Sequence, residues 1–177
     1  MIHKLKLTPG IYLVGFMASG KTTIGRQLAY ELGWSFADTD EDLEAEQKQT
    51  IAQIFETRGE DEFRKVEARA IQKRVKTVRT GRPLVVSLGG GAFSQQDNFE
   101  LLESNGVTIW LDCPLALVRA RLTAQGGMDR PLARDAEKLE HLFFARRAAY
   151  QRADYRIEVT GDNADQTVKK ILALPIF

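Results

Sequence analysis

The chain has 177 residues, of which 44% are hydrophobic and 28% are charged. This length and composition fit one soluble domain with a sizeable core and exclude a disordered or low-complexity chain. A formal net charge of +1 argues against a nucleic-acid surface as the main function. The single cysteine, Cys113, excludes an internal disulfide and fits a reducing, cytoplasmic compartment. No apolar run reaches signal-peptide or transmembrane length, so we expect no membrane association.

Apolar periodicity predicts that strands alternate with helices along the whole chain. Strands are expected at 11–16, 34–36, 84–88, 107–111 and 155–159. Helices are expected at 21–32, 40–47, from Thr50 to a stop at Gly59, then at 60–79, 96–104, 114–124, 135–150, and from 162 or 163 to 172. Residues 125–134 lack periodicity and suggest a mobile loop. Because the strands are almost continuously apolar, we expect a five-stranded parallel sheet between two helical layers.

The first strand leads into a glycine loop with a specific spacing. Gly15, Gly20, Lys21 and Thr22 complete the pattern G-x-x-x-x-G-K-[ST], between an apolar run and the start of a helix. Glycines let backbone N–H groups approach a polyphosphate, and the helix N-terminus adds favourable charge. Lys21 can reach the β- and γ-phosphates, and the Thr22 hydroxyl can ligate Mg²⁺. The motif predicts binding of a nucleoside triphosphate without saying what is done with it.

Two further polar segments follow the next strands. Asp38 and Asp40 come after the second strand, and the triplet Gly89, Gly90 and Gly91 comes after the third. Ligands of parallel sheets bind beyond the carboxyl ends of the strands, so these segments should meet the glycine loop. One carboxylate can hold Mg²⁺ or its water shell while the other accepts a substrate hydroxyl, unless both only cap the next helix. Three glycines favour exposed amides for an anionic or hydroxylated ligand.

Two arginines occupy the apolar stripes of predicted helices. Arg64 heads the stripe of helix 60–79, and Arg146 falls on the stripe of helix 135–150. Either one alone would be an ordinary arginine at a stripe's edge, but two suggest a bidentate clamp for a carboxylate. Arg130 and Arg134 lie in the aperiodic loop. Two interpretations of these arginines stay open: a lid arginine that folds over the transferring phosphates, or an ordinary solvated arginine of a loop.

With these motifs the chain resembles the shikimate kinase family. The segments that carry the resemblance occur in the family's order and spacing over nearly the whole chain: GFMASGKTT, DTD, the FR of DEFRKVE, SLGGG, RPL, and R-x-x-x-Y ending at Tyr150. The resemblance implies a P-loop fold of the nucleoside-monophosphate-kinase type, with a substrate-binding segment near 39–66 and a lid near 125–134. It also implies an enzyme that uses ATP and Mg²⁺ to phosphorylate the 3-hydroxyl of shikimate. We expect the protein to be a monomer.

The resemblance also implies roles for individual residues. Nucleotide binding falls to Gly15, Ala18, Ser19, Gly20, Lys21, Thr22, Thr23, Arg121 and Arg130, and Mg²⁺ binding to Thr22 and Asp38. Substrate binding falls to Asp40, Arg64, Gly89, Gly90, Gly91 and Arg146. The catalytic residues would be Asp40 as the base or orienting group, Lys21, and Arg130 acting from the lid. Arg121 would pack against adenine.

The chain departs from the family pattern at two places. Ala18 stands where the family usually has glycine, which would add roughly 1 kcal/mol of strain if the position needs a positive φ. Arg146-Arg147-Ala148-Ala149-Tyr150 replaces R-x-P-L-Y, so Arg147 competes for the carboxylate role, although only Arg146 lies on the apolar stripe.

Two other functions stay open at this point. One is another small-metabolite kinase on the same scaffold, such as a gluconate kinase. The other is a nucleotide-dependent switch, although the N-K-x-D stretch expected of a guanine switch does not occur in the sequence.

Overall fold

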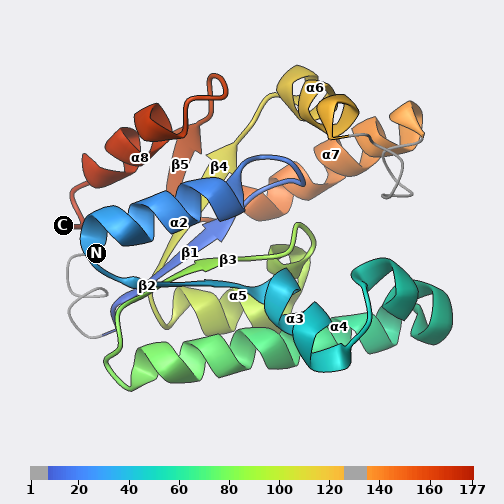
Figure 1. Cartoon of the computed structure of the whole chain (residues 1–177), viewed down its shortest axis with the longest axis horizontal. Coiled ribbons are helices and arrows are strands. Elements are labelled where there is room, and N and C mark those ends of the chain that lie inside the picture. Colours follow the sequence, from blue (N-terminus) through green and yellow to red (C-terminus); the bar gives the residue numbers. More distant parts are fainter. Residues whose placement is uncertain (1–7, 126–134) are drawn as a thin grey trace.

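The structure, a computed structural model, describes residues 8–125 and 135–177 and contains a five-stranded parallel sheet in the order β2-β3-β1-β4-β5 (Figure 1). The strands are β1 Gly10–Val14, β2 Ser35–Asp38, β3 Leu84–Ser87, β4 Val107–Asp112 and β5 Tyr155–Glu158. The helices are α2 Lys21–Leu32, α3 Thr39–Gln47, α4 Ile51–Arg79, the 3₁₀ helix η1 Ala92–Ser94, α5 Gln96–Glu103, α6 Leu115–Ala124, α7 Ala136–Tyr150 and α8 Ala164–Leu172. The predicted parallel sheet is confirmed.

Helices cover both faces of this sheet. Helices α2 and α8 lie on one face, and α4 and α5 lie on the other (Figure 1). Every residue of β1, β3 and β4 is buried, which explains why these strands are almost continuously apolar. The three-layer αβα architecture expected from the sequence is therefore correct. Among the described residues, no helix has the length and apolar character needed to cross a membrane.

Local signals set the ends of several helices where the sequence predicts them. Helix α2 ends before Gly33, which adopts φ +66° and donates its N–H to the last carbonyls of the helix. Thr50 and Gln53 form a reciprocal capping box at the start of α4. Gly59, with φ +80° and ψ 173°, interrupts the helical backbone inside α4. The predicted division of this segment into two helical pieces is thus confirmed.

The other predicted boundaries of helices and strands agree with the structure to within two residues. Strand β2 extends to Asp38 because it pairs in parallel with β3, where Asp38 lies opposite Ser87. Pro114 is not the first helical residue as predicted: with ψ 144° it is extended and precedes α6 as its N-cap. The short helix η1 was not predicted. Residues 126–134, which contain Arg130, Arg134 and most of the predicted lid, lie outside the described residues.

Candidate active site

The carboxyl ends of three neighbouring strands bring the predicted site segments together. Ser87, the last residue of β3, lies opposite Leu13 of β1 on one side and Asp38 of β2 on the other. The glycine loop and the glycine triplet closely follow β1 and β3, and the two aspartates lie at the end of β2 and just beyond it. The expected convergence of the three segments is therefore present in the fold.

The phosphate loop, Gly15 to Thr22, has the backbone that an anion site requires. Gly15 and Gly20 have φ +148° and +93°, and a Cβ at Gly15 would lie 2.8 Å from a β4 carbonyl oxygen. Gly20 is the N-cap of α2 and has no side chain, so the first amides of the helix stay available for an anion. Lys21 Nζ donates to the carbonyl oxygens of Gly15 at 2.9 Å and Phe16 at 2.8 Å. The ammonium group therefore lies over the loop, where phosphates would bind.

Ala18 occupies the loop in a left-handed conformation. Its φ of +56° is one that residues with a Cβ adopt at a cost of about 1–2 kcal/mol. Arg121 Nη1 donates to the Ala18 carbonyl oxygen at 2.9 Å and so holds this part of the loop. The positive φ suspected from the sequence is present. Of the neighbouring loop residues, Ser19 is fully buried and Thr23 is exposed.

The two aspartates face different partners. Asp38 accepts a hydrogen bond of 2.6 Å from the Thr22 hydroxyl, and its other oxygen accepts the amides of Asp40 and Glu41 at the start of α3. Asp38 is thus both a helix cap and a neighbour of the phosphate loop. Asp40 points to the glycine triplet, because a Cβ added at Gly89 would lie 2.7 Å from Asp40 Oδ1. Asp38 therefore lies beside the phosphate loop and Asp40 beside the glycine triplet, and their separate roles stay predictions.

The donors beside the phosphate loop suit Mg²⁺. The Thr22 hydroxyl and the Asp38 carboxylate are hard oxygen ligands. In the described ranges, no group of three or more His, Cys, Asp or Glu side chains is placed to hold a metal ion alone. Mg²⁺ keeps several of its waters and takes few ligands from a protein when phosphates supply others, so one hydroxyl with a carboxylate near its water shell suits it.

The glycine triplet leaves room for both predicted arginines. A Cβ at Gly91 would lie 2.6 Å from Arg64 Nη2 and 3.0 Å from Arg146 Nη2, and one at Gly90 would lie 3.1 Å from Arg146 Nη1. Gly91 has φ −95°, which any residue can adopt, so glycine here provides space and not backbone freedom. The two guanidinium groups converge on one point, as a clamp for an anion requires.

Arg64 is held by acidic neighbours and keeps one donor unused. Its Nη1 lies 2.8 Å from Glu67 Oε1, and its Nη2 lies 3.4 Å from Glu60 Oε1. Within the described part of the chain, the buried Nε has no hydrogen-bond partner. An unsatisfied buried donor costs about 1–3 kcal/mol. A bound carboxylate could satisfy this donor.

Glu67 is a site residue that the sequence reasoning missed. Only 2% of its surface is exposed, and a Cβ at Gly89 would lie 3.0 Å from its Oε2. Burial raises the pKa of the Glu67 carboxyl, and the charges of Arg64 and Arg146 partly counteract this rise. The available signal was the spacing: Glu67 lies three residues after Arg64, on the same face of one helix.

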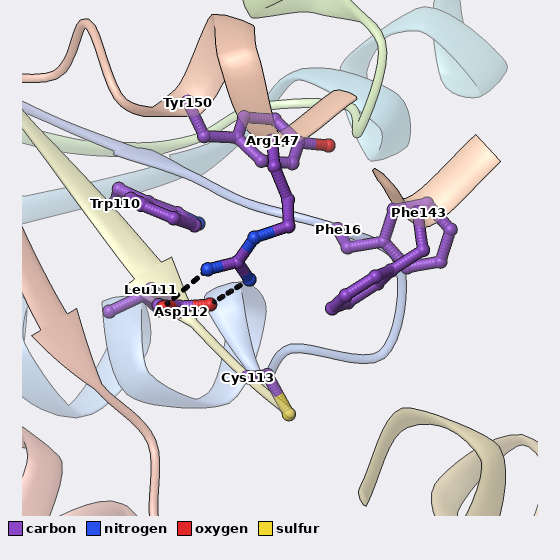
Figure 2. A pocket seen from close by; sticks show the side chains of 8 residues that line it. All are labelled: Phe16, Trp110, Leu111, Asp112, Cys113, Phe143, Arg147 and Tyr150. Atoms are coloured by element: carbon purple, nitrogen blue, oxygen red, sulfur yellow. Dashed lines mark hydrogen bonds and ion pairs between the residues drawn. The ribbon is translucent and has the colours of Figure 1, made fainter. Parts of the chain in front are cut away.

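Arg147 points away from the glycine triplet. Its Nη1 lies 2.7 Å from Asp112 Oδ1 at the end of β4, and its guanidinium stacks on Trp110 (Figure 2). On the same helix, the Tyr150 hydroxyl donates to the Gly90 carbonyl oxygen at 2.6 Å. Burial raises the pKa of Tyr150 to about 12. Of the two adjacent arginines, Arg146 is the one whose side chain reaches the triplet.

Arg121 lies between the phosphate loop and the loop after β5. Besides the Ala18 carbonyl oxygen it binds the Gly161 carbonyl oxygen at 2.9 Å and Asp162 Oδ1 at 3.0 Å. Its contact with adenine stays a prediction. Cys113 is buried nearby, and burial raises the pKa of its thiol, which agrees with the inert role expected from the sequence.

Comparisons with known proteins agree with this geometry. A family model described as shikimate kinase matches residues 17–174. A shikimate kinase of Persephonella marina is 41% identical over 163 residues, which cover 92% of this chain and 96% of that protein. A solved shikimate kinase from Acinetobacter baumannii, in complex with shikimate, has 34% identity and a TM-score of 0.84, with 97% of this chain and 95% of that one covered. A gluconokinase from Sinorhizobium meliloti, at 17% identity, a TM-score of 0.62 and coverage of 94% and 91%, shares the fold alone. The chain belongs to the shikimate kinase family.

Proposed function

We propose that this protein transfers the γ-phosphoryl group of ATP to the 3-hydroxyl of shikimate. The observation that carries the proposal is the convergence of Arg64 and Arg146 on Gly91, beside Asp40 and next to a phosphate loop. A paired guanidinium site suits a small carboxylate, and Asp40 offers an acceptor for a hydroxyl of the same molecule. The carboxylate and the hydroxyl of one small acid are thereby given separate partners.

On the phosphate side, the loop amides and Lys21 would hold the β- and γ-phosphates. Lys21 would exchange the carbonyl oxygens of Gly15 and Phe16 for phosphate oxygens, so the loop does not have to rearrange around a new charge. Thr22, and Asp38 through water, would hold Mg²⁺, which neutralises charge on the phosphates. Arg130 is proposed to act from the lid near 125–134.

On the acceptor side, Asp40 would orient the attacking hydroxyl and take up its proton. Arg64 and Arg146 would bind the carboxylate, and Glu67 would hold the Arg64 guanidinium in place before the substrate arrives. Most of the rate increase would then come from positioning and charge neutralisation, as is usual for phosphoryl transfer. The substrate-binding segment would comprise residues 39–66.

Other expectations from the sequence stay predictions. These are that the protein works as a monomer in the cytoplasm, that it binds neither nucleic acid nor membrane, and that it uses ATP with Mg²⁺. The buried thiol of Cys113 is compatible with a reducing compartment and does not test it.

A coupled assay of ADP release tests the proposed function. The purified chain, with ATP and Mg²⁺, is given shikimate, gluconate or nucleoside monophosphates as acceptors. We expect turnover with shikimate, loss of turnover when the metal is chelated, and recovery on adding Mg²⁺. Faster turnover with gluconate would identify another metabolite kinase, and nucleotide binding with no acceptor-dependent turnover would favour a switch.

A further inference from the structure

A carboxylate at the end of β4 binds two arginines from different elements. Asp112, which is 8% exposed, lies 2.7 Å from Arg147 Nη1 of α7 and 2.7 Å from Arg156 Nη2 of β5. Arg147 adds a second hydrogen bond to Asp112 at 3.3 Å, so its contact is bidentate (Figure 2). Bidentate arginine–carboxylate pairs fix orientation as well as charge. The side chain of Arg147 is therefore fixed in direction.

Aromatic rings complete the surroundings of Arg147 and extend to Arg146. The Arg147 guanidinium carbon lies 4.9 Å from the Trp110 ring centre and 5.6 Å from that of Phe143. Phe143 packs edge-on against Phe16, with ring centres 5.2 Å apart, and the Arg146 guanidinium carbon lies 5.8 Å from the Phe16 ring centre. Each of the two adjacent arginines thus contacts one ring of this aromatic pair.

Because Arg146 and Arg147 are adjacent on one helix, fixing the direction of the Arg147 side chain also fixes the direction in which Arg146 leaves the helix. Consecutive residues of an α-helix point about 100° apart, whereas residues four apart share a face. Arg146 and Tyr150 therefore face the glycine triplet together, and Arg147 faces Asp112. With Arg147 held by β4 and Tyr150 held by the Gly90 carbonyl oxygen, the rotation of α7 about its axis is set from two directions.

We propose that the Asp112–Arg147 pair positions Arg146 by setting the rotation of α7. The inference rests on the proposed function, in which Arg146 binds the substrate carboxylate, and it makes Arg147 a positioning residue with no contact to the substrate. It also gives a role to Arg147, which stands at the position that the family pattern R-x-P-L-Y leaves variable.

Alanine variants of Arg147 and Arg156 test the proposal. Both side chains bind the Asp112 carboxylate, but only Arg147 belongs to α7. Arg147→Ala should raise the KM for shikimate by about tenfold and leave kcat and the KM for ATP within about twofold of the parent, since a small displacement of the clamp weakens substrate binding. Asp112 keeps Arg156 as a partner in this variant, so the protein should still fold. Arg156→Ala, the matched control, should keep the parent KM for shikimate. Equal effects of the two variants, or no effect of Arg147→Ala, would overturn the proposal.

Asp112→Asn separates positioning from direct binding of the substrate. If Arg147 acts through Asp112, this variant should raise the KM for shikimate as Arg147→Ala does. The double variant, Asp112→Asn with Arg147→Ala, should then have a KM for shikimate no higher than that of either single variant. If Arg147 instead binds the carboxylate directly, Asp112→Asn frees its guanidinium, and the KM stays unchanged or falls. That result would refute positioning.

Arg146→Ala distinguishes the failure of this proposal from the failure of the proposed function. If Arg146→Ala raises the KM for shikimate strongly and Arg147→Ala does not, only the positioning proposal fails. If Arg146→Ala leaves that KM unchanged, the carboxylate clamp fails, and the positioning proposal fails with it. Thermal unfolding midpoints of every variant check that the kinetic changes occur in folded protein.

Discussion

Replacing Gly91 by alanine tests the arginine clamp without removing either arginine. The added Cβ would lie 2.6 and 2.8 Å from the two terminal nitrogens of Arg64, and 3.0 Å from Arg146 Nη2. Ordinary contacts begin at 3.4 Å, so the Arg64 guanidinium must move by about 0.8 Å, the difference between 3.4 and 2.6 Å. Both moved groups are the ends of long side chains. The stability of the fold should therefore stay within about 1 kcal/mol of the parent.

Substrate binding should respond much more strongly than stability. A displacement near 1 Å in a positioning contact can cost up to about 100-fold. We therefore expect the KM for shikimate of Gly91→Ala to rise by about 10- to 100-fold, or about 1.4–2.7 kcal/mol. The KM for ATP should stay near the parent value, because the closest atoms to the new Cβ belong to the two arginines. Steady-state kinetics with each substrate varied in turn measure both constants.

The neighbouring glycines provide graded controls. In Gly90→Ala the closest new contact is 3.1 Å to a single arginine, so the KM for shikimate should rise less than in Gly91→Ala. In Gly89→Ala the new Cβ meets Asp40 Oδ1 at 2.7 Å, so kcat should fall more than shikimate binding weakens. A parent-like KM in Gly91→Ala, or a larger effect in Gly90→Ala, would refute the clamp.

Three further variants test other parts of the site. Asp40→Asn should lower kcat far more than it weakens ATP binding, measured by steady-state kinetics; near-parental turnover would exclude Asp40 as the base. Ala18→Gly relieves a left-handed alanine worth about 1–2 kcal/mol and adds about 0.5–1 kcal/mol of unfolded-state entropy, so urea unfolding should show equal or greater stability. A clear loss of stability would contradict this. Because burial raises the folded-state pKa of Glu67, its ionised form lowers stability at pH above that pKa, and the loss disappears as pH falls through it. The stability of the parent relative to Glu67→Gln should therefore increase as the pH falls toward the ordinary pKa of a glutamate carboxyl, and a difference independent of pH would argue against the assignment.

Sequence patterns predicted the elements of this fold, whereas the order of its strands was not predicted. Helix α2 has the predicted bounds because Gly20 and Gly33 mark its two ends locally. The strand order places β3 between β1 and β2, and it depends on crossovers that no local pattern records. Helix η1 has three residues, too few to show a period.

The candidate site shows the same division between local and long-range information. Spacing identified the phosphate loop and placed Arg64 and Arg146 on inward helical faces, where the structure has them. The pairing of Asp112 with Arg147 joins residues 35 positions apart, through the packing of α7 against β4. The buried state of Glu67 depends likewise on what covers α4. Sequence reasoning missed Asp112, whose partners come from other elements, and Glu67, whose burial comes from other elements.

The hydrogen bond from Tyr150 to the Gly90 carbonyl oxygen has a consequence for changes in acidity. A phenol whose pKa is about 12 keeps its proton at every pH near neutrality. The hydrogen bond between α7 and the glycine triplet therefore does not depend on pH in this range. Glu67, which lies beside the neighbouring Gly89, carries a carboxyl whose pKa burial has raised. Acidification that protonates Glu67 would therefore remove a negative charge beside the triplet while the hydrogen bond from Tyr150 to Gly90 stays intact.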